Sequence, residues 1–157
     1  WTPFLTMLFF GIMFLGGSSG STSGGVKVLR HLILIKNGFL EFKRSLHPNA
    51  IFPLRHNNHV VEKPIIIHVL AFFILYLILF IIGAGVLSAL GLDFVSAIGG
   101  AASSLGNVGP ALGTLGPISN FDSLPEIGKY WCAFLMLVGR LELFTVLIFF
   151  TPYFWKN

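Results

Sequence analysis

Hydrophobic residues fall into long runs that are separated by short polar or glycine-containing stretches. Residues 2–15 form the first of these apolar runs. A helix of about 14 residues reaches roughly 21 Å, which is less than the ~30 Å thickness of the hydrocarbon core of a bilayer. This run therefore cannot cross a membrane by itself.

The first run leads into residues 16–25, which are all Gly, Ser or Thr, and a second helical pattern covers residues 26–42. Together the two patterns predict one broken helix. Unpaired backbone groups are costly in hydrocarbon, so irregular backbone at membrane depth is tolerated where it is buried in protein or lines water. The break therefore predicts a cavity or a pore beside residues 16–25.

Residues 27–63 carry seven of the ten Lys and Arg residues of the chain. By the positive-inside rule, this segment is expected on the cytoplasmic side. Within it, Asn57 and Asn58 lie in the middle of residues 52–61, and Asn tolerates the backbone angles of a tight two-residue turn. These residues predict a small β-hairpin.

Residues 65–90 contain no Asp, Glu, Lys or Arg. As a helix, about 26 residues reach roughly 39 Å, so the pattern predicts a tilted membrane span over residues 65–91. The small-residue stretch that follows, residues 93–103, is too short to cross a membrane. It predicts a re-entrant half-helix with Asp93 near its N-cap.

Glycine and proline then interrupt residues 104–110 so often that we expect irregular backbone there. A last apolar run opens at Pro125, a residue that favours the first turn of a helix, and predicts a span over residues 125–151. The order of span, half-helix, irregular loop and span is that of a pore-forming unit. The predicted fold class is an all-α membrane protein with a helix–pore-loop–helix repeat and a broken transmembrane helix upstream.

A selectivity filter requires backbone carbonyls aimed at one axis, and glycine permits the backbone angles that this needs. The candidate filter residues are Leu105, Gly106, Asn107, Val108 and Gly109. The half-helix would point its negative C-terminal end at a permeating cation. In the alternative interpretation, Gly106 and Gly109 merely terminate a helix in an extracellular loop.

Arg140 and Glu142 interrupt the last apolar run. Charges inside a membrane usually face protein or water, so Arg140 either faces the conduction path or pairs with a residue on another helix. Glu142 is two positions further on and lies on a different face of a helix, so we do not expect these two residues to pair with each other.

Composition supports the membrane assignment, because 55% of the 157 residues are hydrophobic, 10% are charged and the mean hydropathy is +0.85. The basic residues lie between apolar runs and form no long patch, so nucleic acid is not an expected partner. The predicted spans contain no catalytic triad, no His-Glu-x-x-His motif and no paired carboxylates, so we do not expect an enzyme. The first residue is Trp1 and no basic leader precedes the first run, so we expect further spans upstream.

Four stretches resemble the Trk/Ktr/HKT superfamily, and specifically its TrkH-like subunits. The longest is Gly-Gly-Ser-Ser-Gly-Ser-Thr-Ser-Gly-Gly-Val-Lys at residues 16–27, which is similar to the intramembrane loop of that family. The others are His-Pro-Asn-Ala at 47–50, Ser-Leu-Gly-Asn-Val-Gly-Pro at 104–110 and Gly-Arg-Leu-Glu-Leu-Phe-Thr at 139–145. The resemblance covers essentially the whole chain.

The resemblance implies four linked helix–pore-loop–helix repeats around one pore. Residues 1–46 would end the third repeat, residues 47–63 would be the connector and residues 64–157 would be the fourth repeat. Gly109 would be the filter glycine, and the carbonyls of Asn107 and Val108 would bind K⁺, although Asn-Val-Gly departs from the Thr-Val-Gly order of potassium channels. The implied gate consists of Arg140 and the loop residues Gly16, Gly17, Ser18, Ser19, Gly20, Ser21, Thr22, Ser23, Gly24 and Gly25.

The function implied is potassium uptake through a gated cation-selective pore, with K⁺ as the transported ligand and no covalent cofactor. The implied partners are the three other repeats of the same protein, a second copy in a homodimer, a cytosolic TrkA-like nucleotide-binding regulatory subunit and the lipid bilayer. The implied location is the bacterial inner membrane, with the C-terminus in the cytoplasm. The alternative is a non-conducting scaffold or anchor subunit of a transport complex, in which the breaks are packing features.

Overall fold

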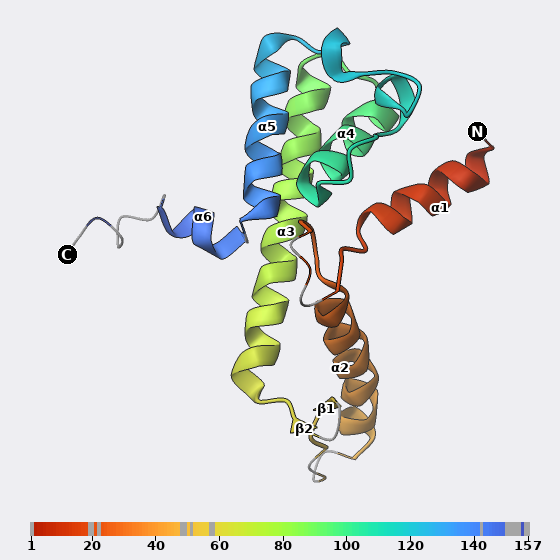
Figure 1. The fold of residues 1–157 in the computed structure, drawn as a ribbon. Coiled ribbons are helices and arrows are strands. Elements are labelled where there is room, and N and C mark those ends of the chain that lie inside the picture. The colour runs from red at the N-terminus through yellow and green to blue at the C-terminus, as the bar shows by residue number, and fades with distance from the viewer. Residues whose placement is uncertain are drawn as a thin grey trace.

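The computed structural model describes residues 2–18, 21, 23–47, 50, 52–56, 59–141, 143–149 and 155. Helices dominate this part of the chain, and one short hairpin interrupts them (Figure 1). The helices are α1 (Pro3–Met13), α2 (Val28–Leu46), α3 (Lys63–Ala89), α4 (Phe94–Gly106), α5 (Glu126–Arg140) and α6 (Leu143–Phe149). The strands are β1 (Arg55–His56) and β2 (His59–Val60), and two 3₁₀ turns are η1 (Gly113–Leu115) and η2 (Phe121–Ser123).

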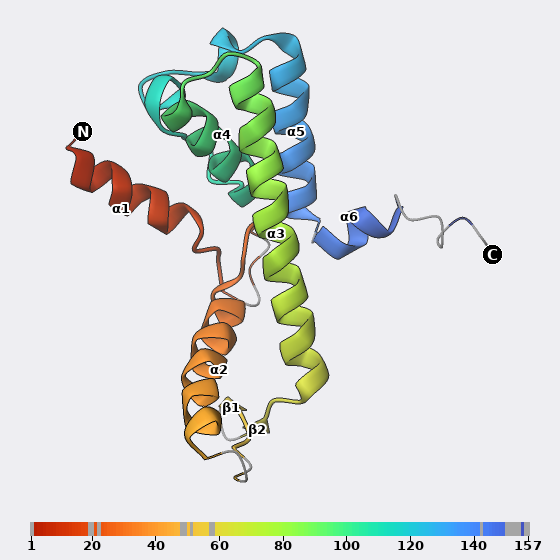
Figure 2. The ribbon, with the colours of Figure 1, turned by 180° about the vertical axis from the view of Figure 1, so that it is seen from behind.

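Helix α3 is the axis of the fold (Figure 1). Among the described helices it is the one long and apolar enough to cross a membrane, with 27 residues and a Pro at its first turn. Its second half packs against α4 and α5, and its first half packs against α2. Figure 2 shows α1 and α6 projecting to opposite sides of this axis.

The core between α3, α4 and α5 joins segments that are distant in the sequence. Leu105 from α4, Leu135 from α5 and Tyr76 from α3 are buried together. Val26, which follows the glycine-containing loop, is also buried in this cluster. Gly83 permits the close approach of α3 to α5, because a Cβ at Gly83 would lie 2.9 Å from the Leu135 side chain.

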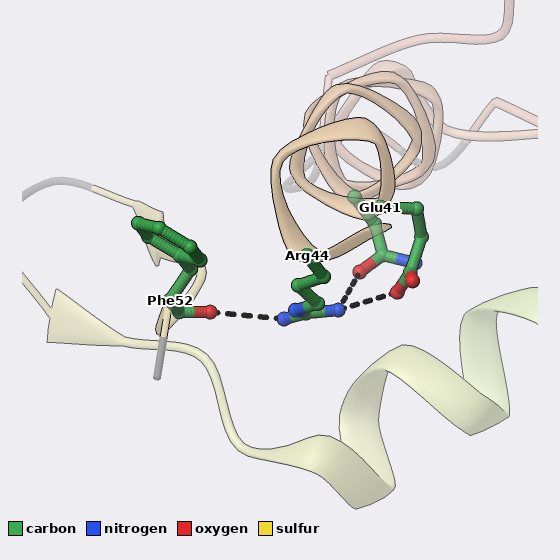
Figure 3. Close-up of polar contacts among 4 residues, drawn as sticks. Glu41, Arg44 and Phe52 are labelled. Atoms are coloured by element: carbon green, nitrogen blue, oxygen red, sulfur yellow. Dashed lines mark hydrogen bonds and ion pairs between the residues drawn. The ribbon is translucent and has the colours of Figure 1, made fainter. Parts of the chain in front are cut away.

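A second core joins α2, the hairpin and α3, around Ile33, Leu54 and Ile66. The two strands pair antiparallel, with Arg55 opposite Val60, at the place where the sequence predicts a hairpin. Arg44 on α2 forms hydrogen bonds both to the connector and within the helix (Figure 3). Its Nη2 donates to the Phe52 carbonyl at 3.0 Å, while Nη1 donates to Asn37 and Glu41.

Several predicted boundaries differ from the observed ones. Helix α4 continues to Gly106, three residues past the predicted end at Ser103. The predicted continuous last span is wrong, because α5 ends at Arg140 and α6 starts at Leu143 in a new direction. The second half of the broken helix begins at Val28 and not at residue 26, because Val26 turns into the core. Residues 150 and 151 lie outside the described residues.

Candidate ion-conduction site

Side-chain hydrogen bonds of Asp93 and Ser96 fix the start of helix α4. At its start, the Asp93 carboxylate accepts a hydrogen bond from the Ser96 backbone N–H at 3.2 Å, and this hydrogen bonding to Ser96 lowers the pKa of Asp93. The buried Ser96 hydroxyl accepts from both the N–H and the hydroxyl of Thr114, each at 2.8 Å. These bonds hold the chain that returns from the candidate filter against α4.

The end of α4 forms a Schellman motif, a common way to close a helix at its C-terminus. The Val108 N–H donates to the Ser103 carbonyl at 3.0 Å, and the Asn107 N–H donates to the Ser104 carbonyl at 3.2 Å. Asn107 has left-handed backbone angles, with φ 54° and ψ 41°. Asn is one of the few residues besides Gly that adopt this conformation readily, so Asn107 ends the helix.

The five candidate filter carbonyls form two groups: three lie against or accept a hydrogen bond from other groups of the protein, and two accept no hydrogen bond from a described residue. Leu105 and Gly106 are helical, and their carbonyls lie against the backbones of Gly139 and Gly25, respectively. The prediction that all five residues have irregular backbone is therefore wrong for these two. The Gly109 carbonyl accepts a hydrogen bond from the Ser103 hydroxyl at 2.9 Å.

Asn107 and Val108 are the remaining members, and no described residue donates a hydrogen bond to their carbonyls. Val108 and Gly109 lie exposed on the surface of this chain. Gly109 has a φ of 106°, and a Cβ at that position would meet no atom within 4 Å. Its glycine is therefore required for backbone conformation and not for space.

The Asn107 side chain turns away from this exposed edge. Its Nδ2 donates to the Met136 carbonyl on α5 at 3.0 Å. Two glycines flank the amide, because a Cβ at Gly24 or at Gly139 would come within 2.5 Å or 3.0 Å of that nitrogen. Asn107 thus lies where α4, α5 and the glycine-containing loop meet.

The candidate gate loop is irregular and is anchored at its base. Gly16 N–H donates to the Val26 carbonyl at 2.9 Å, and Val28 N–H donates to the Gly17 carbonyl at 3.1 Å. Ser21 and Ser23 bond to each other through their hydroxyls at 3.0 Å. Gly25, with a φ of 77°, donates to the Gly139 carbonyl at 3.2 Å. Ser19, Gly20 and Thr22 lie outside the described residues.

Arg140 lies exposed at the end of α5, next to this loop. A cavity of about 80 Å³ separates them, and its lining includes Ser21, Ser23, Lys27, Arg30 and Arg140. The Arg30 guanidinium carbon lies 3.8 Å from the centroid of the Phe72 ring. Three basic residues thus line this cavity together with Ser21 and Ser23. Glu142 lies outside the described residues.

The structure brings together the predicted filter, loop and Arg140, which the sequence places up to 124 positions apart. Sequence reasoning missed Ser103, Met136 and Gly139, which hold the filter backbone and the Asn107 amide. For Gly139 a signal existed, because glycine inside an apolar helix often marks a close helix contact. A carbonyl acceptor such as that of Met136 leaves no trace in a sequence.

Comparison with known proteins places this arrangement in a family. The family model TrkH, described as "Cation transport protein", matches residues 1–156. "Trk system potassium uptake protein TrkH" of Escherichia coli (strain K12) is 40% identical over 157 residues, which are 100% of this chain and 32% of that protein. "Trk system potassium uptake protein TrkI" of Halomonas elongata is 41% identical over 162 residues, with coverage of 100% and 32%.

Among solved structures, the potassium transporter TrkH from Vibrio parahaemolyticus matches with a TM-score of 0.89 at 37% identity. The match covers 99% of this chain and 33% of that one, so the chain spans about a third of the length of the relatives it matches. The likeness confirms the predicted fold class of an all-α membrane protein with a pore-loop helix. The chain belongs to the TrkH family of cation transport proteins.

Proposed function

We propose that this chain contributes to potassium uptake through a gated, cation-selective pore, as the names of its relatives suggest. The observation that carries the proposal is the turn at the end of α4. There the carbonyls of Asn107 and Val108 have no donor among the described residues, while Val108 and Gly109 form an exposed edge. Bare carbonyls of this kind replace the hydration shell of a K⁺ ion in a selectivity filter.

Helix α4 supports the same conclusion through its dipole. Its C-terminus carries a partial negative charge and ends at Asn107, so it favours a cation and disfavours an anion beside Val108. In this proposal, residues 64–157 form the fourth of four repeats that share one pore, and residues 1–46 belong to the third. The candidate ligands are the carbonyls of Asn107 and Val108.

The loop of residues 16–25 acts as the gate in this proposal. Its residues Gly24 and Gly25 lie directly against the end of α4. The basic residues Lys27, Arg30 and Arg140 line a cavity together with Ser21 and Ser23 of the loop. Positive charge at this position sets an electrostatic barrier to a dwelling cation. Retraction of the loop and of Arg140 would lower that barrier.

The same proposal includes the membrane location of the protein and its partners. Residues 27–63 and the C-terminus face the cytoplasm of a bacterium, the protein lies in the inner membrane as a homodimer, and a TrkA-like nucleotide-binding subunit regulates it. The concentration of basic residues in 27–63 supports the assignment of this side.

Two changes in the full-length protein test the proposal. Gly109→Ala adds a methyl group that has room but forces an L-residue to a φ of 106°, at a cost of about 1–3 kcal/mol. We expect it to reduce rubidium uptake and potassium-dependent growth, whereas Gly85→Ala, at an open position on α3, leaves both unchanged. Shortening residues 18–23 is expected to raise flux. Wild-type flux in both variants would instead support the non-conducting scaffold.

A further inference from the structure

Asn107 has two roles in the structure that involve different atoms. Its left-handed backbone ends α4, and its carbonyl belongs to the candidate filter. Its side-chain amide points to α5, where Nδ2 donates to the Met136 carbonyl at 3.0 Å. Gly or Asp would also satisfy the backbone requirement, so the backbone alone does not explain an amide that reaches another helix.

The amide occupies a narrow slot between two glycine backbones. A Cβ at Gly24 would lie 2.5 Å from Nδ2 and 3.0 Å from the Asn107 Cβ. A Cβ at Gly139 would lie 3.0 Å from the same nitrogen. Real Cβ atoms essentially never come as close as 2.5 Å to another heavy atom, so a side chain at Gly24 displaces either the loop or the Asn107 amide.

The two sides of the slot are themselves bonded to each other. The Gly25 N–H donates to the Gly139 carbonyl at 3.2 Å, directly next to Gly24. The Asn107 side chain and this backbone bond are therefore two of the contacts that join the loop, α5 and the end of α4. A displacement of the loop at Gly24 removes packing from the Asn107 side chain, and the backbone carbonyl of the same residue is a candidate filter ligand.

We propose that Asn107 is a positioning residue whose side-chain amide couples the gate loop to the filter. With the loop in place, Gly24 and the Met136 carbonyl hold the amide and thereby fix the Asn107 carbonyl. When the loop moves away, Gly24 no longer packs against the amide, and the Asn107 carbonyl in the filter is held less firmly. The position of the gate then alters both the rate and the ion preference of passage. This inference rests on the proposed function.

A double-mutant cycle in the full-length protein tests the packing. Gly24→Ala is combined with Asn107→Gly, which keeps the left-handed turn but empties the slot. We expect Gly24→Ala to lower the unfolding midpoint in the wild-type background and to have much less effect beside Asn107→Gly. Gly38→Ala, on α2 with no atom near its Cβ, is the control. Equal effects of Gly24→Ala in both backgrounds would overturn the proposal, whether or not the protein transports potassium.

Uptake measurements test the coupling itself. We expect Asn107→Gly and Asn107→Asp to lower the ratio of rubidium to sodium uptake and to raise KM for rubidium. Loss of one hydrogen bond corresponds to roughly a twofold to tenfold change. Asn120→Asp, in an exposed turn, is the control. A variant with normal KM and ion ratio but a lower unfolding midpoint would show a purely structural role and overturn the coupling. Absence of uptake by the wild-type protein would instead refute the proposed function.

Discussion

The carbonyl oxygen of Leu105 lies so close to Gly139 that a Cβ at Gly139 would overlap it. This contact sets the distance between the end of α4 and the end of α5, and it brings Gly139 next to Gly25 of the loop. A methyl group at Gly139 must therefore push α5 away from the candidate filter.

We predict that Gly139→Ala destabilises the protein by about 1–3 kcal/mol, which is typical of overpacking in a core. The measurement is the unfolding midpoint of the purified protein in detergent. Gly85→Ala, with no atom within 4 Å of its Cβ, is the matched helical control. Equal midpoints for the two variants would show that the contact between Leu105 and Gly139 does not set the distance between α4 and α5.

Ser96→Ala is predicted to loosen the chain after the filter. The Ser96 hydroxyl is buried and accepts both hydrogen bonds of Thr114, so its loss leaves two donors without their acceptor. The expected destabilisation is about 1–3 kcal/mol. Ser88→Ala, on an exposed position of α3, serves as the control. Faster hydrogen exchange at Thr114 in the first variant alone would support the prediction, and unchanged exchange would contradict it.

How much of this arrangement the sequence predicts depends on the kind of signal. Hydropathy predicts α3, because a helix that crosses a lipid bilayer needs a long apolar run. The run of Gly, Ser and Thr predicts the loop, because glycine is unfavourable inside a helix. The small-residue pattern predicts an end of α4 three residues too early, since the helix continues through Gly106 and is capped by Asn107. The sequence marks glycine as the expected terminator, whereas here Asn has the left-handed conformation.

The break after Arg140 could not be predicted from hydropathy, because the apolar run continues without a Pro. Helix α6 turns so that Leu143 and Val146 join the cluster that contains Val26 and Phe72. That turn depends on tertiary packing between segments more than 70 positions apart. Likewise, the contact of Asn107 with Met136 follows from the crossing of α4 and α5 and not from any local pattern.

Asp93 gives a prediction for pH dependence. It lies in the turn between α3 and α4, and hydrogen bonding to Ser96 lowers its pKa from the ordinary value of 3.8. Its stabilising contribution is therefore complete above that ordinary value and is lost as the pH falls through the lowered pKa. Asp93→Asn keeps an accepting oxygen but does not titrate, so its unfolding midpoint should fall less than that of the wild-type protein as the pH is lowered below the ordinary pKa of 3.8.

The free energy that Asp93 contributes as the N-cap of α4 is tested by Asp93→Ala near neutral pH. Loss of an N-cap residue costs about 0.5–2 kcal/mol. Asp122→Ala is a suitable comparison, because that carboxylate is exposed and lies in η2. If the unfolding midpoints of the wild-type protein and of Asp93→Asn fall equally with decreasing pH, the ionised Asp93 carboxylate does not stabilise α4.

Arg44→Lys is predicted to loosen the connector although it keeps the charge. The planar guanidinium reaches the Phe52 carbonyl with one nitrogen and Asn37 and Glu41 with another, which a single ammonium group cannot reproduce. We expect faster proteolysis within residues 47–62 for Arg44→Lys and Arg44→Ala. Lys43→Ala, at an exposed neighbouring position, should behave as wild type. Full protection in Arg44→Lys would mean that charge alone holds the connector.

The most direct test is to locate thallium(I), an electron-dense substitute for potassium, by anomalous diffraction from crystals of the full-length protein. The account predicts a bound ion coordinated by the carbonyl oxygens of Asn107 and Val108, with the loop of residues 16–25 next to it. Ions bound elsewhere, with these two carbonyls hydrogen-bonded inside the protein, would contradict it.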